Sequence, residues 1–430
     1  GASSGMAMAH WEIQGWMILI LGWVFVPFYT RSMVYTMPEF LERRYNPQSR
    51  TILSVISLVS YVLTKVAVTV YAGGLVFQQV FGIKELWGID FFWIAAIGLV
   101  VLTALYTIFG GMKSVLYTSV LQTPILLLGS LIILVLGFKE LGGWDEMMRV
   151  CGAVTVNDYG DTMTNLIRSN DDANFPWLGA LIGSAIIGFW YWCTDQFIVQ
   201  RVLSGKNEME ARRGTIFGAY LKLLPVFLFL IPGMIAFALH QKYIGAGGEG
   251  FLPMLANGTA NADAAFPTLV AKLLPAGVKG LVVCGILAAL MSSLASLFNS
   301  SAMLFTIDFY KRFRPETPEK KLVGIGQVAT VVIVILGILW IPIMRSVGDV
   351  LYTYLQDVQS VLAPGIAAAF LLGICWKRTS AQGGMWGLIA GMVIGLTRLG
   401  AKVYYSNAGE VADSTFKYLF YDMNWLFFCG

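Results

Sequence analysis

A hydroxyl-rich segment lies within an otherwise apolar part of the sequence. Residues 289 to 305 read "ALMSSLASLFNSSAMLF", in which Ser292, Ser296 and Ser300 recur every four positions. On a helix, this spacing places the three hydroxyls along one face. Such a face can let membrane helices pack closely, or it can bind a hard cation such as sodium through its oxygens. A cation site would also need a second element whose unwound backbone exposes carbonyls.

Ionisable and amide side chains occur inside several other apolar segments. A charge at membrane depth is costly, and it usually faces a cavity or a partner. We therefore expect a polar interior, filled by water or by a ligand, that contains Glu12, Lys65, Asp195, Lys222, Gln356 and Asp357.

The composition predicts the solvent that surrounds these residues. Of the 430 residues, 57% are hydrophobic and 13% are charged, and the mean hydropathy is +0.70. Because a soluble domain carries about 25% charged residues, we expect a polytopic protein embedded in a lipid bilayer. The five cysteines lack the spacing of a disulfide framework or zinc site. We expect no nucleic-acid partner, and the sequence leaves the oligomeric state open.

Ten apolar segments are long enough to cross a bilayer, which takes about 20 residues as a helix. Helices are expected because lipid offers no partner to an open sheet edge. The approximate limits are 7 to 29, 52 to 81, 89 to 109, 114 to 137, 177 to 199, 214 to 239, 277 to 309, 322 to 344, 349 to 375 and 383 to 400. An eleventh segment begins near 417, and the opening "GASSGMAMAH" lacks an initiator Met, so we expect a fragment cut at both ends.

The basic residues predict the orientation of the spans. Lys and Arg are in excess in the connections that are cytoplasmic if the first span runs inward. The two longest loops, 138 to 176 and 240 to 276, then lie outside, and Arg398 counts with the external connections. We expect a multi-pass protein of the plasma membrane, or of the inner membrane in a bacterial host.

Several long motifs carry a specific resemblance. The chain contains "YTMPEFLERRYN", "YTIFGGMKSVLYT", "FWYWCTDQFIVQRVLSGKN", "GAYLKLLPVFLFLIPGM", "MSSLASLFNSSAMLFTIDFYKR" and "APGIAAAFLLGICWKR". In order and spacing these resemble the sodium/solute symporter family, in its sodium/glucose cotransporter branch. The likeness extends over essentially the whole chain.

The resemblance implies an all-α fold with a core of five plus five helices related by an inverted repeat. Residues 1–430 would form a single transmembrane transporter domain. The first nine spans would be core helices two to ten, and residues 1 to about 5 the stub of core helix one. The fragment would then lack most of core helix one and the C-terminal helices.

The resemblance also implies a sodium site. Carried over residue by residue, it would use the carbonyl of Ala289 and the hydroxyls of Ser292 and Ser293. Some relatives bind a second sodium through an acid and an extra hydroxyl, at positions that here hold Ser119 and Ala295. Because a hydroxyl and a methyl replace these groups poorly, we expect one sodium per solute.

The implied sugar site combines hydrogen-bonding side chains with aromatic rings. Glu12 would accept hydroxyl hydrogens, Lys222 would donate, and Gln356 can do both. The rings of Tyr191 and Trp192 would cover the apolar face of a sugar ring. Alternatively, Glu12 and Lys222 form a structural ion pair, and Gln356 makes a helix-packing hydrogen bond. The substrate-binding residues on this interpretation are Glu12, Tyr191, Trp192, Lys222 and Gln356.

Other positions of the family pattern imply gates. Trp11 and Tyr352 would form the outer gate, and Tyr191 would serve as the inner lid. Two positions depart from the pattern, because Gly188 and Gly15 replace polar side chains of relatives. Fewer side chains there would enlarge the pocket or admit water.

Charged residues beside the implied sites carry further expectations. Asp195 and Arg201 would hold the inner gate or neighbouring helices. Lys65 and Thr69 would act along the ion pathway or in voltage sensing.

We therefore expect a secondary active transporter that couples inward sodium flow to uptake of a glucose-like or galactose-like hexose by alternating access. Within the family, an inositol, an amino acid, a carboxylate or a sialic acid is the alternative solute. A sugar sensor would need an attached signalling domain, and a channel would need a selectivity filter. We expect no enzyme, because the interior charges are too dispersed for a catalytic cluster.

Overall fold

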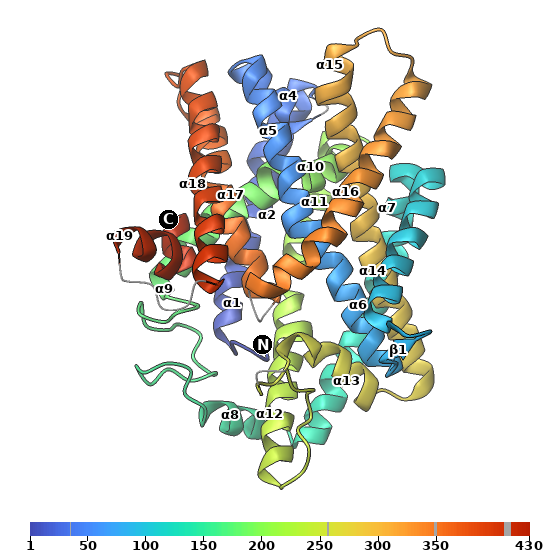
Figure 1. Ribbon diagram of the computed structural model, residues 1–430, viewed down its shortest axis with the longest axis vertical. Helices are drawn as coiled ribbons and strands as arrows, with labels where there is room; N and C mark the ends of the chain where they lie inside the picture. Colours follow the sequence, from blue (N-terminus) through green and yellow to red (C-terminus); the bar gives the residue numbers. More distant parts are fainter. Residues whose placement is uncertain (35, 256–257, 348–350, 408–413) are drawn as a thin grey trace. The chain divides into compact units, whose positions relative to one another are not determined.

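The computed structural model describes residues 1–34, 36–255, 258–347, 351–407 and 414–430. Within these ranges it describes every side chain except those of residues 10, 11, 13, 106, 108–115, 118, 121, 344–347, 352, 353, 406 and 407. The described chain is mainly helical and divides into two compact units. Its named strands, β1 (Glu85–Leu86) and β2 (Ile89–Asp90), form a short antiparallel hairpin (Figure 1).

Unit 1 comprises Gly1–Glu12, Val68–Trp177 and Leu223–Ser296. Its core surrounds α12, in which Met234, Ile235 and Leu239 are all buried. A helix that is apolar on every side is stable only when it is covered all round. The helical elements of this unit are α1 (Ala7–Trp11), α6 (Ala67–Phe81), α7 (Phe91–Leu141), α8 (Trp144–Gly152), η5 (Val226–Leu230), α12 (Ile231–Gly245), η6 (Ala262–Ala264), α13 (Ala265–Leu273) and α14 (Ala276–Met303), of which α6 and α14 continue into unit 2.

One expected connection is absent from the described backbone. We predicted a break between spans 89 to 109 and 114 to 137, but α7 runs as a single helix over Phe91–Leu141. The two glycines in that connection each cost a helix about 1 kcal/mol relative to alanine. They therefore permit a break there without imposing one.

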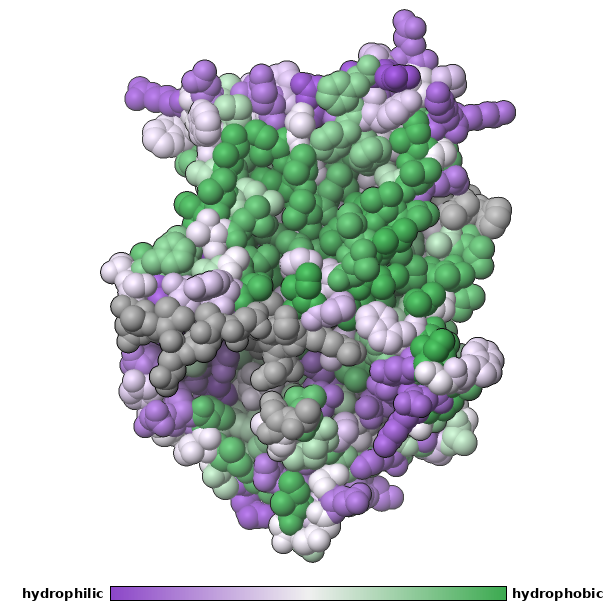
Figure 2. All heavy atoms as spheres, in the orientation of Figure 1, coloured by the Kyte–Doolittle hydropathy of each residue, from purple (hydrophilic) through white to green (hydrophobic). Residues whose placement is uncertain are grey.

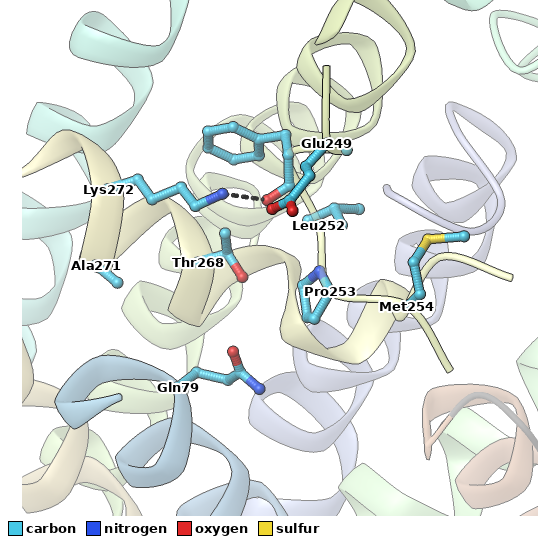
Figure 3. A pocket seen from close by; sticks show the side chains of 10 residues that line it. Gln79, Glu249, Leu252, Pro253, Met254, Thr268, Ala271 and Lys272 are labelled. Atoms are coloured by element: carbon cyan, nitrogen blue, oxygen red, sulfur yellow. Dashed lines mark hydrogen bonds between the residues drawn. The ribbon is translucent and has the colours of Figure 1, made fainter. Parts of the chain in front are cut away.

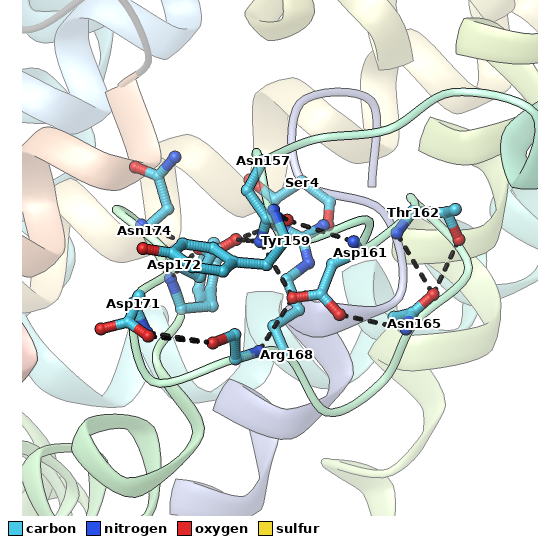
Figure 4. A network of polar contacts seen from close by, with 12 residues as sticks. Ser4, Asn157, Tyr159, Asp161, Thr162, Asn165, Arg168, Asp171, Asp172 and Asn174 are labelled. Atoms are coloured by element: carbon cyan, nitrogen blue, oxygen red, sulfur yellow. Dashed lines mark hydrogen bonds and ion pairs between the residues drawn. The ribbon is translucent and has the colours of Figure 1, made fainter.

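The loop after α8 is ordered by side-chain hydrogen bonds (Figure 4). Asp161 is central, because its carboxylate accepts from the Asn157 amide at 2.9 Å and from the Ser169 backbone N–H at 2.8 Å. Arg168 is buried, pairs with Asp172 at 3.4 Å and donates to the carbonyl of Ser4. The loop therefore has a defined structure although it contains little regular secondary structure.

Unit 2 comprises Ile13–Ala67, Leu178–Lys222 and Leu297–Gly430. Several of its helices contain π-helical turns, a feature that recurs at functional sites. Its elements are η1 (Glu12–Trp16), α2 (Met17–Ile20), η2 (Leu21–Phe25), α3 (Val26–Ser32), α4 (Met37–Arg44), α5 (Pro47–Ser60), η3 (Tyr61–Val66), α9 (Trp177–Gly188), η4 (Phe189–Thr194), α10 (Gln196–Leu203), α11 (Glu208–Leu221), η7 (Leu304–Tyr310), α15 (Lys311–Phe313), α16 (Glu319–Val347), α17 (Leu351–Cys375), α18 (Ala381–Asn407), α19 (Thr415–Lys417), η8 (Tyr418–Asp422) and α20 (Trp425–Cys429). The first residues of η1 and α9 belong to unit 1.

The outer faces of unit 2 are apolar. Val328, Val332 and Leu339 of α16 are exposed, as are Val393 and Ile394 of α18. Figure 2 shows hydrophobic side chains over these helices and polar side chains at their ends at the top of the view. An exposed apolar band between polar ends is the surface that a lipid bilayer covers.

Nine helical stretches in the described residues are long and apolar enough to span a membrane. They are Ala7–Ser32, Pro47–Phe81, Gln122–Leu141, Trp177–Thr194, Glu208–Gly245, Ala276–Phe313, Glu319–Ile343, Tyr354–Cys375 and Ala381–Tyr405. A shorter apolar stretch, Phe91–Leu105, falls within the predicted span 89 to 109. All ten predicted spans therefore have an apolar helical counterpart.

Candidate functional site

The predicted aromatic residues lie where a helix of unit 2 is interrupted. The π-helical turn η4 contains Tyr191 and Trp192, and Asp195 directly after it leaves helical geometry, with φ −80° and ψ 126°. The Asp195 carboxylate then caps α10 by accepting from the Phe197 N–H at 3.0 Å. An aspartate at this position satisfies a backbone donor that would otherwise be unpaired. Asp195 therefore stabilises the start of α10 directly after the break.

The structure brings three of the predicted substrate residues together within unit 2. The rings of Tyr191 and Trp192 are nearly perpendicular, with centroids 4.9 Å apart. Lys222, the C-cap of α11, places its ammonium 5.9 Å from the centre of the Trp192 ring. The ammonium of Lys65 lies 5.0 Å from the centre of the Tyr191 ring. Each of the two rings is therefore approached by a lysine.

Two buried polar atoms in this region are unsatisfied. The indole Nε1 of Trp192 and the Oε1 of Gln356 have no hydrogen-bond partner among the described residues. Gln356 is 4% exposed and lies on α17, which packs against η4. Leaving such atoms unpaired costs about 1 to 3 kcal/mol each. One is a donor and the other an acceptor, so hydroxyl groups can satisfy both.

Glu12 is the first residue of the 3-10 turn η1 and is half-buried. It belongs to unit 1, whereas the other predicted substrate residues belong to unit 2. Its grouping with them therefore stays a prediction. The predicted outer-gate residues Trp11 and Tyr352 lie outside the side chains that the structure describes.

The two glycines that depart from the family pattern do not leave open space. A Cβ at Gly15 would lie 2.8 Å from Cγ of Lys222. A Cβ at Gly188 would lie 2.9 Å from Cβ of Gln14 and 3.1 Å from the Gln14 carbonyl oxygen. The expectation of an enlarged pocket is therefore wrong at these points. Each missing side chain instead allows a close approach by another part of unit 2.

The predicted sodium residues Ala289, Ser292 and Ser293 all lie on α14 in unit 1. Ser292 is 5% exposed, and its hydroxyl oxygen lies 2.5 Å from that of Ser119 on α7. The structure thus places Ser119, the residue at the position of the family's acid, directly beside the predicted site. Two hydroxyl oxygens supply neutral ligands of the kind that sodium accepts. Whether these residues bind sodium stays a prediction.

The described chain also contains polar clusters that the sequence did not pair. Arg398, which we assigned to an external connection, is fully buried on α18. It donates to the carbonyl oxygens of Leu419 at 3.3 Å and Met423 at 2.6 Å, and it lies 3.6 Å from the Asp357 carboxylate. Lys402 approaches the same carboxylate at 2.5 Å. The sequence shows that ionisable residues lie in or near apolar spans, but it does not show which residues they pair with.

A cavity of about 480 Å³ opens on unit 1 (Figure 3). Gln79, Thr268 and Lys272 line it together with the residues from Glu249 to Met254. Lys272 donates to the carbonyl of Phe251 at 2.8 Å. Because its lining includes none of the residues predicted to bind sodium or sugar, this cavity is separate from the predicted sites.

Comparison with known proteins matches residues 1–391 to the sodium:solute symporter family. The chain belongs to this family. Members are multi-pass membrane transporters, in agreement with the membrane spans described above. The predicted family and the membrane location are therefore confirmed.

The names of the relatives differ in the solute that they mention. The sodium/myo-inositol cotransporter 2 of Homo sapiens is 37% identical, and the sodium/glucose cotransporter 4 of Homo sapiens is 39% identical. Each alignment covers 93% of this chain and 60% of the relative. The chain thus spans about three-fifths of the length of these curated relatives.

A solved structure supports the fold. The substrate-bound, outward-open Na⁺-coupled sialic acid symporter aligns with a TM-score of 0.72 at 21% identity, covering 100% of this chain and 81% of that one. At this identity the similarity concerns the fold alone. It confirms the all-α, five-plus-five inverted-repeat class that the motifs implied.

Proposed function

We propose that this symporter couples inward flow of sodium to uptake of a neutral polyol by alternating access. The solute class is supported by the unsatisfied polar atoms of Trp192 and of Gln356, which lies on a helix that packs against η4. A hydroxyl can accept from Trp192 Nε1–H and donate to Gln356 Oε1. The rings of Tyr191 and Trp192 offer an apolar face to the C–H groups of a sugar or cyclitol. A hexose of the glucose or galactose type is the leading candidate.

Glu12 supports a neutral solute over an anionic one. Its carboxylate accepts hydrogens from hydroxyl groups, but it would repel a carboxylate on an amino acid or a sialic acid. We therefore place Glu12, Lys222 and Gln356 as hydrogen-bonding partners of the solute, with Tyr191 and Trp192 against its ring.

Myo-inositol is a second candidate for the same site. One of the named relatives is a sodium/myo-inositol cotransporter. Inositol presents a ring of hydroxyls to the same donors and acceptors as a hexose. The two solutes differ in shape rather than in chemistry, and uptake measurements can separate them.

For the ion, we propose one sodium at Ala289, Ser292 and Ser293 of α14. The buried Ser119–Ser292 hydroxyl pair supports an oxygen-rich environment there. The pair contains no carboxylate, and a carboxylate is the ligand that would favour a second cation. The proposed sodium ion would complete its coordination with backbone carbonyls from an unwound segment.

Uptake into proteoliposomes containing the full-length protein tests this function. Labelled D-glucose, D-galactose, myo-inositol, an amino acid and sialic acid are offered with an inward sodium gradient, or with choline in place of sodium. We expect sodium-dependent uptake of at least one of the first three. Uptake that is unchanged when choline replaces sodium would contradict sodium coupling, and uptake of only an anionic solute would contradict the polyol assignment.

A further inference from the structure

A buried ion pair joins two interrupted helices of unit 2. Lys65 lies on the π-helical turn η3, and Asp195 lies at the break between η4 and α10. The two residues are 9% and 5% exposed, and the ammonium of Lys65 contacts Oδ2 of Asp195. Because 130 positions separate them in the sequence, the pair forms only in the folded chain.

The other oxygen of Asp195 is also engaged. Oδ1 accepts from the hydroxyl of Tyr61 at 2.8 Å and from the backbone N–H of Phe197 at 3.0 Å. Tyr61 lies on η3, as Lys65 does, and Phe197 is the second residue of α10. The carboxylate therefore ties the start of α10 to η3 through both of its oxygens.

The ammonium of Lys65 contacts aromatic rings on both sides of the break. It lies 5.0 Å from the ring centre of Tyr191, which precedes Asp195, and 4.4 Å from that of Phe197, which follows it. The ring of Tyr61 completes the enclosure at 4.7 Å. Rings around a cation attract it through their faces. The ammonium of Lys65 therefore contacts Asp195 at the break and the rings of Tyr191 and Phe197 on either side of it.

This arrangement has a geometric consequence. At Asp195 the backbone leaves helical geometry, so regular helical hydrogen bonds do not fix the direction of the chain. A buried ion pair is weak evidence for stability, because desolvation offsets most of its attraction. Its contacts here instead fix a position, namely that of the Tyr191 ring relative to the break.

We propose that Lys65 and Asp195 are positioning residues, whose ion pair holds the break and thereby orients Tyr191 toward the solute. The inference rests on the proposed function, in which Tyr191 contacts the transported polyol. On this proposal the pair acts through Tyr191. Neutralising it should therefore weaken solute binding while leaving the sodium site on α14 unchanged.

Three variants of the full-length protein separate positioning from charge balance. Lys65→Met keeps the apolar stem, and Asp195→Asn keeps a side-chain oxygen that can cap α10. Each single variant leaves one buried charge unpaired, which is destabilising. The double variant carries neither charge, so its thermal unfolding temperature should recover toward the wild-type value. Arg213→Met is the matched control, since Arg213 forms an exposed pair with Glu210.

We expect the double variant to retain at least a fivefold increase in the polyol concentration for half-maximal uptake, with the sodium dependence unchanged. Hydrogen exchange should be faster than in the wild type at the backbone amides of residues 193 to 199. The Arg213→Met control should match the wild type in both measurements.

Recovery of wild-type uptake and exchange in the double variant would overturn the proposal, because the pair would then only balance charge. If the double variant does not fold, Tyr61→Phe replaces it in both measurements. This variant keeps both charges and removes one tie to Asp195, so unchanged exchange would equally contradict positioning. Absence of sodium-dependent polyol uptake by the wild type would refute the proposed function instead, while hydrogen exchange still tests the role of the pair at the break.

Discussion

At the scale of single residues, two unsatisfied polar atoms support the proposed solute site. Trp192 and Gln356 bury a donor and an acceptor that no described residue satisfies, in a chain where many other buried polar atoms have partners. The ring of Tyr191 lies against that of Trp192, Lys222 approaches the Trp192 ring, and the helix that carries Gln356 packs against η4. The combination of apolar faces and a few unsatisfied polar groups is characteristic of small-molecule sites.

Gln356→Leu should raise the polyol concentration for half-maximal uptake about tenfold. The change removes one hydrogen bond, worth about 1.4 kcal/mol, which is a factor of ten in affinity. Trp192→Phe should act in the same direction, since it keeps a ring but loses the donor. Ser360→Ala on the same helix is the control, because that hydroxyl already bonds the Asp357 carbonyl at 2.6 Å. Equal half-saturation in Gln356→Leu and the control would contradict the assignment.

Ser292→Ala and Ser293→Ala should each raise the sodium concentration for half-maximal uptake at least tenfold. Each substitution removes one oxygen ligand from a cation that needs several. The measurement is uptake at a fixed polyol concentration over a range of sodium concentrations. Ser130→Ala serves as the control in unit 1, because its buried hydroxyl is satisfied by the Leu126 carbonyl at 2.8 Å. A sodium dependence that is unchanged in both α14 variants would place the ion elsewhere.

At the scale of elements, helix irregularities and close crossings determine the geometry of unit 2. Tyr191 and Lys65 lie in π-helical turns, and Lys222 caps the end of α11. Helices α17 and α18 cross closely, because Gly391 faces Gly365. Glycines at helix crossings let backbones approach within the membrane. Interruptions thus position the candidate side chains, and close crossings hold the helices that carry them.

Gly391→Ala should lower the free energy of unfolding by about 1 to 3 kcal/mol through overpacking. The added Cβ would lie 2.7 Å from Cα of Gly365, and a backbone atom cannot move aside as a side chain can. Gly387→Ala on the same helix is the matched control, since a Cβ there meets nothing within 4 Å. Thermal unfolding of the two purified variants checks this difference. Equal unfolding temperatures would show that the crossing tolerates the methyl group.

The loop after α8 should lose its order in acid. The pKa of Asp161 lies below its usual value, because the Asn157 amide and the Ser169 N–H donate to the carboxylate. A depressed pKa means that the charged form stabilises the fold. This contribution is present above the unfolded pKa of about 3.9, and it disappears as the pH falls through the lower folded pKa.

Hydrogen exchange of residues 153 to 176 should therefore be slow at pH 7 and at pH 5, and should accelerate below about pH 4 once intrinsic exchange rates are corrected for pH. Asp161→Asn should exchange faster already at pH 7, whereas Asp158→Asn, at an exposed position, should behave as the wild type. Loop exchange that does not change with acid would show that Asp161 does not order it.

At the scale of the whole molecule, the energy that one sodium ion releases on entry can be compared with the proposed ratio of one sodium ion per solute. One charge moving through 100 mV is worth about 2.3 kcal/mol, and a tenfold sodium gradient adds about 1.4 kcal/mol. Together these permit accumulation of a neutral solute by a factor of several hundred. One sodium ion is therefore sufficient for concentrative uptake.

We expect a ratio near one between transported charge and transported polyol in proteoliposomes. At the position of the family's acid, the hydroxyl of Ser119 meets that of Ser292. At the position of the extra hydroxyl stands Ala295, which is fully buried. Simultaneous current and tracer measurements check the ratio. A value near two would show that a second sodium binds despite these residues.

Much of the fold could be predicted because membrane insertion is governed by local composition. Each of the ten predicted spans has an apolar helical counterpart, and long motifs identified the family. The connection near residues 110 to 113 was predicted wrongly, since two glycines weaken a helix without imposing a break. Tyr191, Trp192 and Lys222 could be named together from motifs alone, whereas the grouping of Glu12 with them stays a prediction.

The sequence by itself determined the solvent, the helical class and the family of this protein, because hydropathy and motifs are properties of neighbouring residues. Only the tertiary structure decided which distant residues meet. Lys65 and Asp195 are 130 positions apart, and Ser119 and Ser292 are 173 apart. The same holds for Arg398, assigned from sequence to a connection but buried against Asp357 and the carbonyls of Leu419 and Met423. A buried charge must find its partner in three dimensions, and no local pattern specifies which residue that is.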